Sequence, residues 1–153
     1  MSDLLKELYQ EIILDHGNTP RNFGKCEPFN KSADGHNPLC GDKVHLTLLV
    51  DDQNIIKDIK FTGEGCAISI ASTSLMTQNI KGKSLEYANN LFQDFSNLVT
   101  GSSDELQIIT EEDSLYSLKG VGAFPMRVKC ATLSWHAFKL SLIHISEPTR
   151  QWS

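Results

Sequence analysis

The sequence has no apolar run near the ~20 residues that a membrane-spanning helix needs, and Lys and Arg form no cluster anywhere in it. Residues 1–7 also lack the basic segment followed by an apolar segment that marks a secretory signal. We therefore expect a cytoplasmic protein that is not embedded in a membrane. Lys and Arg number 14 against 19 Asp and Glu, a formal charge of −5, so a nucleic-acid-binding role is not expected.

Cysteine is scarce too, with four residues in a chain of 153. In a reducing cytoplasm these four are expected to remain thiols, which favours metal binding or catalysis over a disulfide framework. A chain of this length can bury a core without disulfides. Hydrophobic residues make up 40% and charged residues 22%, as in ordinary globular domains, and no repeat divides the chain, so we predict one domain.

The spacing of apolar residues indicates an α+β protein, in which an antiparallel hairpin packs against helices. Apolar residues alternate with polar ones in the hairpin and recur at helical spacing elsewhere. Gly, Asn and Pro are dense between the first helix and the hairpin, which predicts an irregular loop. The expected elements are a helix at 4–15, a loop at 17–42, strands at 43–50 and 55–62, helices at 67–80 and after Ser84, a helical turn at 112–118, and a helix at 125–143.

Three cysteines and one aspartate occupy positions that suit a metal site. Cys40 and Asp42 are two residues apart, and in an extended chain alternate side chains share a face. Cys66 comes just before a predicted helix, whose N-terminal N–H groups and dipole favour a thiolate. Cys130 is predicted in the first turns of the last helix, beside Lys129.

Three thiolates and one carboxylate form a tetrahedral set suited to Zn²⁺. With a +2 ion the site carries a formal charge of −2, which needs positive groups nearby if it is partly buried. We assign Arg127 to this role, just outside the ligands, and Lys129 and the helix N-termini can add to it. Asp42 is a harder ligand than sulfur, so the set suits a centre that releases a ligand. Inert buried cysteines are the alternative, because spacing alone includes no C-x-x-C pair.

The other polar residues are expected to have structural roles. Cys26 matches no ligand pattern. Of the five histidines, at 16, 36, 45, 136 and 144, His36 is the best placed to touch the site, because it is near Cys40 in the sequence. Asp15 and Arg21 are expected to hold a loop. The Ser and Thr residues in 67–76 are better explained by close helix packing than by catalysis.

Four motifs follow one another along the sequence. They are Ile13-Leu14-Asp15-His16 with Pro20-Arg21-Asn22, Asn37-Pro38-Leu39-Cys40-Gly41-Asp42, Phe61-Thr62-Gly63-Glu64-Gly65-Cys66-Ala67-Ile68-Ser69, and Phe124-Pro125-Met126-Arg127-Val128-Lys129-Cys130-Ala131. In this order they resemble the motifs of the U-type proteins of iron–sulfur cluster assembly, the family of IscU and the N-terminal part of NifU, and the resemblance spans roughly residues 5–142.

Within this family the chain resembles the SufU branch more than IscU. IscU proteins carry a His where this chain has Lys129, and the motif that recruits their dedicated Hsp70 chaperone is missing here. Residues 100–119 look like the insertion typical of SufU proteins. The resemblance implies one domain at 1–142 with about three strands in its sheet, and it leaves a tail, 143–153, to which we assign no function.

The resemblance also implies a function. Such proteins bind zinc through residues matching Cys40, Asp42, Cys66 and Cys130, and accept persulfide sulfur from a cysteine desulfurase of the SufS type. A His of the desulfurase is thought to replace one cysteine on the zinc. The freed cysteine, which matches Cys40, then attacks the persulfide, and a SufBCD-type scaffold can follow downstream.

Two other functions remain open from the sequence. The same thiolates could hold an iron–sulfur cluster, in which case the protein would be a scaffold that assembles the cluster and passes it on. Alternatively, the zinc could be purely structural in a domain that only binds partners. Losing Asp42 would then reduce stability without a specific defect in sulfur transfer.

Overall fold

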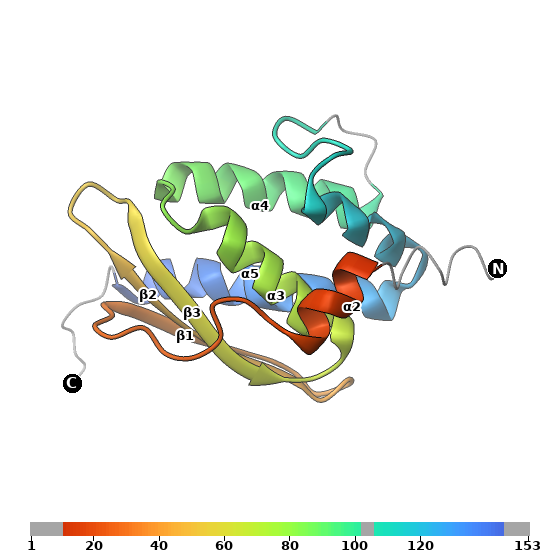
Figure 1. The fold of residues 1–153 in the computed structure, drawn as a ribbon, viewed down its shortest axis with the longest axis horizontal. Coiled ribbons are helices and arrows are strands. Elements are labelled where there is room, and N and C mark those ends of the chain that lie inside the picture. Colours follow the sequence, from red (N-terminus) through yellow and green to blue (C-terminus); the bar gives the residue numbers. More distant parts are fainter. Residues whose placement is uncertain (1–10, 102–105, 146–153) are drawn as a thin grey trace.

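In the computed structural model, the described residues are 11–101 and 106–145, with side chains up to Leu142. A three-stranded antiparallel sheet in the order β1-β2-β3 packs against helices, which confirms the α+β prediction (Figure 1). The elements are α2 (Glu11–Asn18), β1 (Lys31–Asn37), β2 (Asp42–Val50), β3 (Ile56–Glu64), α3 (Ala67–Ile80), α4 (Leu85–Thr100), the 3₁₀ helix η1 (Ser114–Ala123) and α5 (Pro125–Ile145). Residues 4–10 of the first predicted helix and residues 146–153 of the tail lie outside the described residues.

Strand β1 corrects the prediction of an irregular loop over residues 17–42. Its sequence, KSADGHN, has no β-branched or aromatic residue and only one buried apolar side chain, Ala33. Local preference therefore gives no strand signal. The strand forms because β2 offers an antiparallel partner, with Lys31 opposite Leu48 and Asn37 opposite Asp42.

The two predicted strands are confirmed, and their alternating apolar residues are buried on one face. Val44, Leu46 and Leu48 of β2, and Ile59 and Phe61 of β3, are at most 4% exposed. They face the helices, because α5 packs on β1 and β2 and α3 packs on β3. The side of the sheet with these residues is called the core face below, and the opposite side the outer face.

Part of the outer face is covered by the segment that connects α2 to β1. The backbone N–H of Gly24 donates to the Phe61 carbonyl, and the N–H of Cys26 donates to Thr47 Oγ1 at 2.9 Å. Cys26 is fully buried there, and its thiol donates to the Thr47 carbonyl at 3.2 Å. Cys26 is thus part of the packing between this segment and β2.

Helix α3 is buried on nearly all sides, in agreement with the close packing expected from its small residues. Its small hydroxyl residues make internal bonds: Ser72 donates to the Ala131 carbonyl of α5, and Trp135 Nε1 donates to Ser72 Oγ at 3.1 Å. Trp135 also stacks on Phe95 of α4, with ring centroids 4.4 Å apart. These contacts fix α5 against α3 and α4, and with it the position of residue 130.

The segment after α4 is held by one buried carboxylate. Asp94, 3% exposed, accepts hydrogen bonds from the backbone N–H groups of Gln107, Ile108 and Ile109 at 2.6–3.0 Å. The predicted turn at 112–118 overlaps η1. The identification of residues 100–119 as an insertion stays a prediction.

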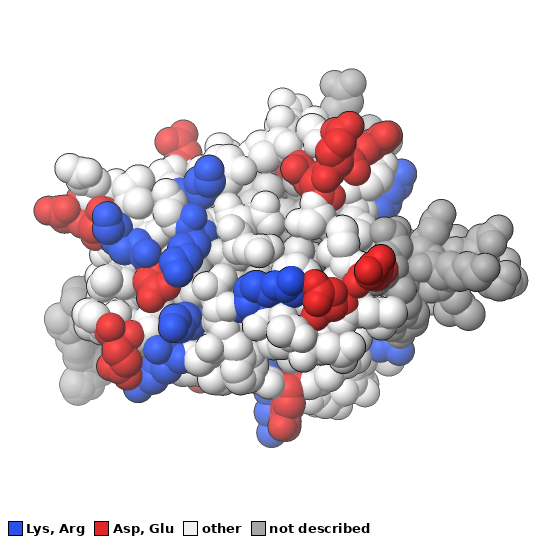
Figure 2. Space-filling view, in the orientation of Figure 1, with Lys and Arg blue, Asp and Glu red and all other residues white. Residues whose placement is uncertain are grey.

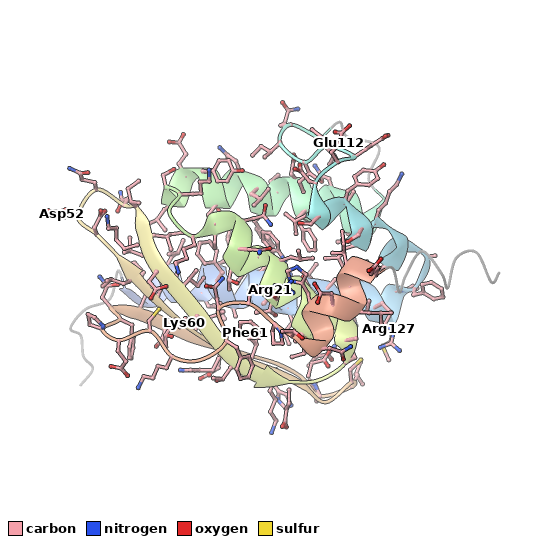
Figure 3. All side chains as sticks on the ribbon, in the orientation of Figure 1. Arg21, Asp52, Lys60, Phe61, Glu112 and Arg127 are labelled. Carbon is pink, nitrogen blue, oxygen red and sulfur yellow. The ribbon has the colours of Figure 1, made fainter. Side chains whose placement is uncertain are left out.

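Each helix in the described ranges is too short or too polar to cross a membrane. On the face seen in Figure 2, Lys and Arg side chains alternate with Asp and Glu over the sheet, and acidic side chains gather near Glu112, which is labelled in Figure 3.

Candidate metal centre

Cys40 lies in the tight turn between β1 and β2. The turn is closed by the Cys40 N–H, which donates to the Asn37 carbonyl at 3.2 Å, and Gly41 follows with a left-handed φ of 73°. Cys40 therefore does not lie in an extended segment with Asp42, the arrangement that the sequence predicted, because β1 ends at Asn37 and β2 begins at Asp42. The turn still brings Cys40 toward Asp42. It does so because the chain reverses direction, and not because the two side chains share one face of a strand.

Asp42 begins β2 on its core face and is fully buried. Its Oδ1 accepts the backbone N–H of Cys66 at 2.9 Å, while its Oδ2 is buried without a hydrogen-bond partner among the described residues. A buried carboxylate oxygen without a donor is rare, because desolvating it is costly. Asp42 Oδ2 is therefore free to bind a cation.

Gly65 makes room for this carboxylate. Its φ is 149°, a conformation that residues with a side chain rarely adopt. A Cβ at this position would collide with Asp42 Oδ1 and would lie 3.0 Å from Asp42 Cα. Without glycine here, the end of β3 could not pass so close to Asp42.

The two remaining cysteines come from helices. Cys66 is the N-cap of α3, as predicted, and is half-buried. Cys130 is 1% exposed on α5, and its thiol donates to Cys40 Sγ at 3.3 Å. Ligand atoms of Cys40, Asp42 and Cys130 all lie within 4.8 Å of one another, although these residues are up to 90 positions apart.

The Cys130 thiol is strongly biased toward its protonated form. Burial raises its pKa far above the usual range, and the neighbouring Asp42, Cys40 and Cys66 raise it further. Such crowding of acidic groups is unfavourable unless a cation neutralises them. A bound divalent ion would supply that charge.

The residues fit a tetrahedral zinc ion with a small adjustment. Two sulfurs on one Zn²⁺ at ~2.3 Å each are about 3.8 Å apart, so the Cys40 and Cys130 sulfurs need to separate by about half an ångström. The unpartnered Asp42 Oδ2 offers the third donor. The Cys66 thiol is not in the compact group, although it is close enough to affect Cys130. Its assignment as the fourth ligand stays a prediction.

Arg127 is half-buried where α5 begins, three residues before Cys130 (Figure 3). Residues three apart are neighbours on a helix surface, so Arg127 and Cys130 belong to the same side of α5. Lys129 is exposed. Of these two cations, Arg127 is the better placed to offset negative charge at the centre.

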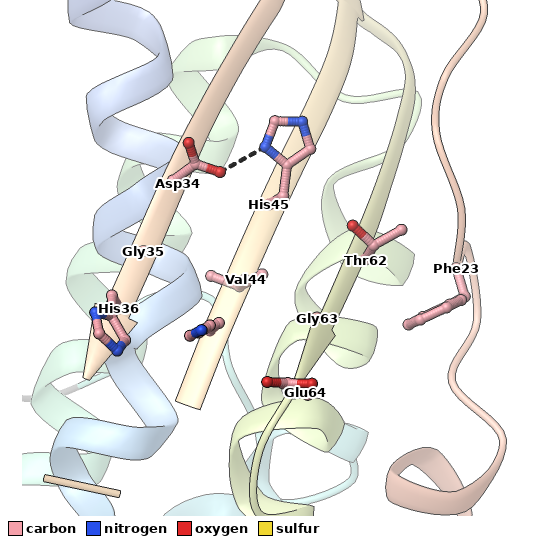
Figure 4. Close-up of a pocket in the computed structure, with 10 residues that line it drawn as sticks. Phe23, Asp34, Gly35, His36, Val44, His45, Thr62, Gly63 and Glu64 are labelled. Atoms are coloured by element: carbon pink, nitrogen blue, oxygen red, sulfur yellow. Dashed lines mark hydrogen bonds and ion pairs between the residues drawn. The ribbon is translucent and has the colours of Figure 1, made fainter. Parts of the chain in front are cut away.

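His36, the histidine best placed in the sequence to touch the site, lies away from the centre. It lies on the outer face, because adjacent residues of a strand point to opposite sides and Asn37 is on the core face. There it lines an open hollow of about 720 Å³ together with Asp34, Lys43 and Glu64 (Figure 4). His45 lines it as well, with its Nδ1 2.6 Å from Asp34 Oδ1. No cysteine lines this hollow.

Asp15 and Arg21 hold a loop, as expected. Arg21 forms an ion pair with Asp15 at 2.7 Å, and its backbone N–H donates to Ser74 Oγ. His16 is buried, with its Nδ1 2.7 Å from the same hydroxyl oxygen. These contacts tie the end of α2 and the following loop to α3.

Two residues that sequence reasoning did not single out shape the centre. Gly65 admits the Asp42 carboxylate, and Asn37 closes the Cys40 turn. The glycine next to a cysteine was visible in the sequence, but its contact with Asp42 requires β2 and β3 to be paired. Asn37 opens one of the motifs, but its burial could not be expected, because the strand that buries it was not predicted.

Comparison with known proteins matches residues 8–144 to the family described as the NifU-like N-terminal domain. The chain is 44% identical over 137 residues to the zinc-dependent sulfurtransferase SufU of Bacillus subtilis, covering 88% of this chain and 89% of that protein. It is 41% identical over 135 residues to the iron–sulfur cluster assembly scaffold protein IscU of Streptococcus pyogenes, with 88% and 82% covered. The crystal structure of FiSufU from Fervidobacterium islandicum AW-1 superposes with a TM-score of 0.78 at 34% identity, covering 90% of this chain and 98% of that one.

Proposed function

Because this chain belongs to the family of NifU-like N-terminal domains, we propose that it is a zinc-dependent sulfur-transfer protein of iron–sulfur cluster assembly. It accepts persulfide sulfur from a cysteine desulfurase of the SufS type, and a SufBCD-type scaffold is its downstream partner. Cys40, Asp42, Cys66 and Cys130 hold the zinc, within one domain formed by residues 1–142.

One observation carries this proposal: Cys40, Asp42 and Cys130 converge at the same end of the core, with ligand atoms within 4.8 Å of one another. The relative from Bacillus subtilis, which is named a zinc-dependent sulfurtransferase, supports the choice of metal and reaction. Bound zinc would keep the thiolates deprotonated at neutral pH.

Cys40 is the sulfur acceptor in this proposal because it is the accessible member of the compact group. Asp42 and Cys130 are buried, whereas Cys40 is half-buried in a turn next to Leu39, which is 66% exposed. A thiolate must be reachable to attack a sulfur–sulfur bond.

The transfer balances without an added oxidant. The Cys40 thiolate attacks the outer sulfur of the desulfurase persulfide and forms a new sulfur–sulfur bond. The original sulfur–sulfur bond breaks, and its electron pair leaves with the desulfurase cysteine as a thiolate. The transferred sulfur, with its proton, becomes the terminal atom of a persulfide on Cys40.

The other residues hold the acceptor in place. Cys130 is fixed because α5 is anchored to α3 and α4 through Trp135. Asp42 is fixed by the Cys66 N–H. Arg127, on the side of α5 that carries Cys130, offsets the negative charge of the ligands.

The test is desulfurase turnover with and without this protein, followed by mass spectrometry of the protein. We expect the wild type to increase alanine release and to gain the mass of one sulfur atom on the peptide containing Cys40. Cys40→Ala should abolish both effects. Cys26→Ala, which removes a thiol on the outer face, is the matched control and should retain them. Full stimulation by Cys40→Ala would refute the acceptor assignment.

A scaffold function is the second candidate, supported by the relative from Streptococcus pyogenes that carries this name. The same thiolates could ligate the iron of a cluster. Protein purified without added iron or zinc discriminates between the two functions. One firmly bound zinc ion favours sulfur transfer, whereas a coloured cluster that passes to an apo-protein favours the scaffold.

A further inference from the structure

Asn37 carries a buried hydrogen-bond donor without an acceptor. The residue is 8% exposed, and its Nδ2 has no partner among the described residues. Buried polar side chains are hydrogen-bonded in the large majority of cases, so an isolated donor points to a group that binds there. The only other buried, unpartnered side-chain atoms in the described chain are Asp42 Oδ2 and Ser134 Oγ.

The orientation of the Asn37 carboxamide is fixed by the Cys40 turn. Its Oδ1 accepts the backbone N–H of Leu39 at 3.3 Å, while its carbonyl accepts the N–H of Cys40 at 3.2 Å. Only the carbonyl end of an amide can accept a backbone N–H, so the other end is the NH₂ group. The turn therefore uses the oxygens of Asn37 and leaves both Nδ2 hydrogens unused.

The position of Asn37 brings this donor to the metal centre. Asn37 is directly opposite Asp42 in the sheet, on the core face. Two residues earlier, Gly35 packs against Leu133 of α5, since a Cβ at Gly35 would lie 3.1 Å from Leu133 Cδ1. Cys130 is one helical turn before Leu133. Asn37 is thus at the end of β1 where α5 presents Cys130.

In this structure Nδ2 has no partner within the described part of the chain, and the Cys130 thiol donates to Cys40. From these observations we infer that Asn37 Nδ2 turns toward the Cys40–Cys130 sulfur pair and donates a hydrogen bond to it when a bound metal ion holds these sulfurs as thiolates. The inference rests on the proposed function, which requires thiolates at this centre. The two sulfurs are 3.3 Å apart, so a donor that reaches one is close to both. Asp42 Oδ2 and Asn37 Nδ2 then have complementary roles, with the oxygen facing the cation and the N–H groups facing the sulfur.

This role makes Asn37 a positioning residue for the centre. Hydrogen bonds to ionised groups are stronger than those between neutral groups. They also withdraw electron density from a thiolate, which changes the energy of its charge transfer to a bound metal. Loss of residues that support metal ligands typically weakens metal binding by about 10–100-fold.

The experiment uses Co²⁺ in the full chain, because cobalt bound to thiolates shows a charge-transfer absorption at longer wavelength than that of zinc thiolates. Affinity is measured by competition with a chelator at pH 8. Asn37→Asp keeps an oxygen for the Leu39 N–H and removes the NH₂ group, whereas Asn37→Ala removes both. Asn30→Asp is the matched control. Unlike Asn37, Asn30 bonds through both ends of its carboxamide, to the Val50 backbone at the far end of the sheet.

We expect the band of wild type and Asn30→Asp to coincide. In Asn37→Asp and Asn37→Ala it should move to longer wavelength, and Co²⁺ should bind about 10–100-fold more weakly. If the band of Asn37→Asp coincides with that of the wild type and only Asn37→Ala binds Co²⁺ more weakly, Asn37 serves only to hold the turn. That result would overturn the inference. Weaker binding in both variants with an unmoved band would mean that Asn37 acts on Asp42, and it would also overturn the inference.

Two further outcomes separate this inference from the proposal it rests on. If the wild type shows no thiolate band with Co²⁺, the proposed centre itself fails. If Asn37→Asp does not fold, the band position of Asn37→Ala decides alone, because loss of the turn bond by itself leaves the sulfur electron density unchanged.

Discussion

Replacing Gly65 by Ala should damage both the stability of the fold and the metal centre. The φ of 149° at Gly65 is unfavourable for alanine, at a cost of about 1–3 kcal/mol. The new Cβ would also meet the Asp42 carboxylate and lie 3.0 Å from Asp42 Cα, which is backbone and cannot rotate away. Moving the carboxylate breaks its hydrogen bond with the Cys66 N–H, which costs about 1.5–3 kcal/mol further.

Together these effects should lower the free energy of unfolding by about 2.5–6 kcal/mol. For a domain of this size each kcal/mol corresponds to a Tm decrease of about 2–4 °C, so the expected decrease is about 5–24 °C. Since Asp42 is a proposed ligand, zinc binding should also weaken by at least about tenfold. Thermal unfolding of the metal-free protein and chelator competition for zinc measure the two effects separately.

Gly82→Ala provides the matched control. Gly82 also has a positive φ, 83°, but a Cβ there would meet no atom within 4 Å. The control should lose about 1–2 kcal/mol from the backbone conformation alone and should bind zinc with wild-type affinity. Wild-type zinc affinity in Gly65→Ala would show that the approach of residue 65 to Asp42 does not shape the centre.

Three further outcomes are expected. Asp94→Asn should cost about 3 kcal/mol in urea unfolding, because the backbone N–H groups of 107–109 lose a charged acceptor and the new NH₂ group faces the Gln107 N–H. An unchanged midpoint would contradict this. Burial, aided by the charge of Arg21, lowers the pKa of His16 below its usual value of 6.5. As the pH falls below 6.5, the unfolded chain therefore takes up a proton on His16 before the folded chain does, and the free energy of unfolding should decrease. His16→Gln should flatten that part of the stability–pH curve, and an identical slope in both proteins would refute the assignment. Removal of the metal by a chelator should lower Tm while the far-ultraviolet circular dichroism at room temperature stays native-like, because the core is large; complete unfolding would contradict this.

The hairpin and the helices could be predicted because their signals are local. Alternation of Val44, Leu46 and Leu48 identifies β2 without knowledge of any other segment. Ser84 likewise predicts the start of α4, and its hydroxyl accepts the Tyr87 N–H. Strand β1 carries no such signal, since it is polar and exists through its pairing with β2.

The site was predictable as a set of residues but not as a geometry. Asp42 and Cys40 were paired for the wrong reason, since a turn brings them together. Cys130 joins them across 90 positions because α5 packs on β1, a contact that no local pattern contains. The resemblance to a family supplied what spacing could not. Because β1 was not predicted, the burial of the Asn37 side chain could not be predicted either.

The burial of Cys26 makes the reactivity of its thiol a measure of whether the segment that covers it is in place. Its thiol is enclosed beneath the segment that follows α2, it donates to Thr47, and burial raises its pKa. The other three cysteines lie at the opposite side of the sheet, in or near a turn and two helices. An alkylating reagent added to the native, metal-free protein should therefore spare Cys26, and its modification would record the moment at which the covering segment detaches from the sheet.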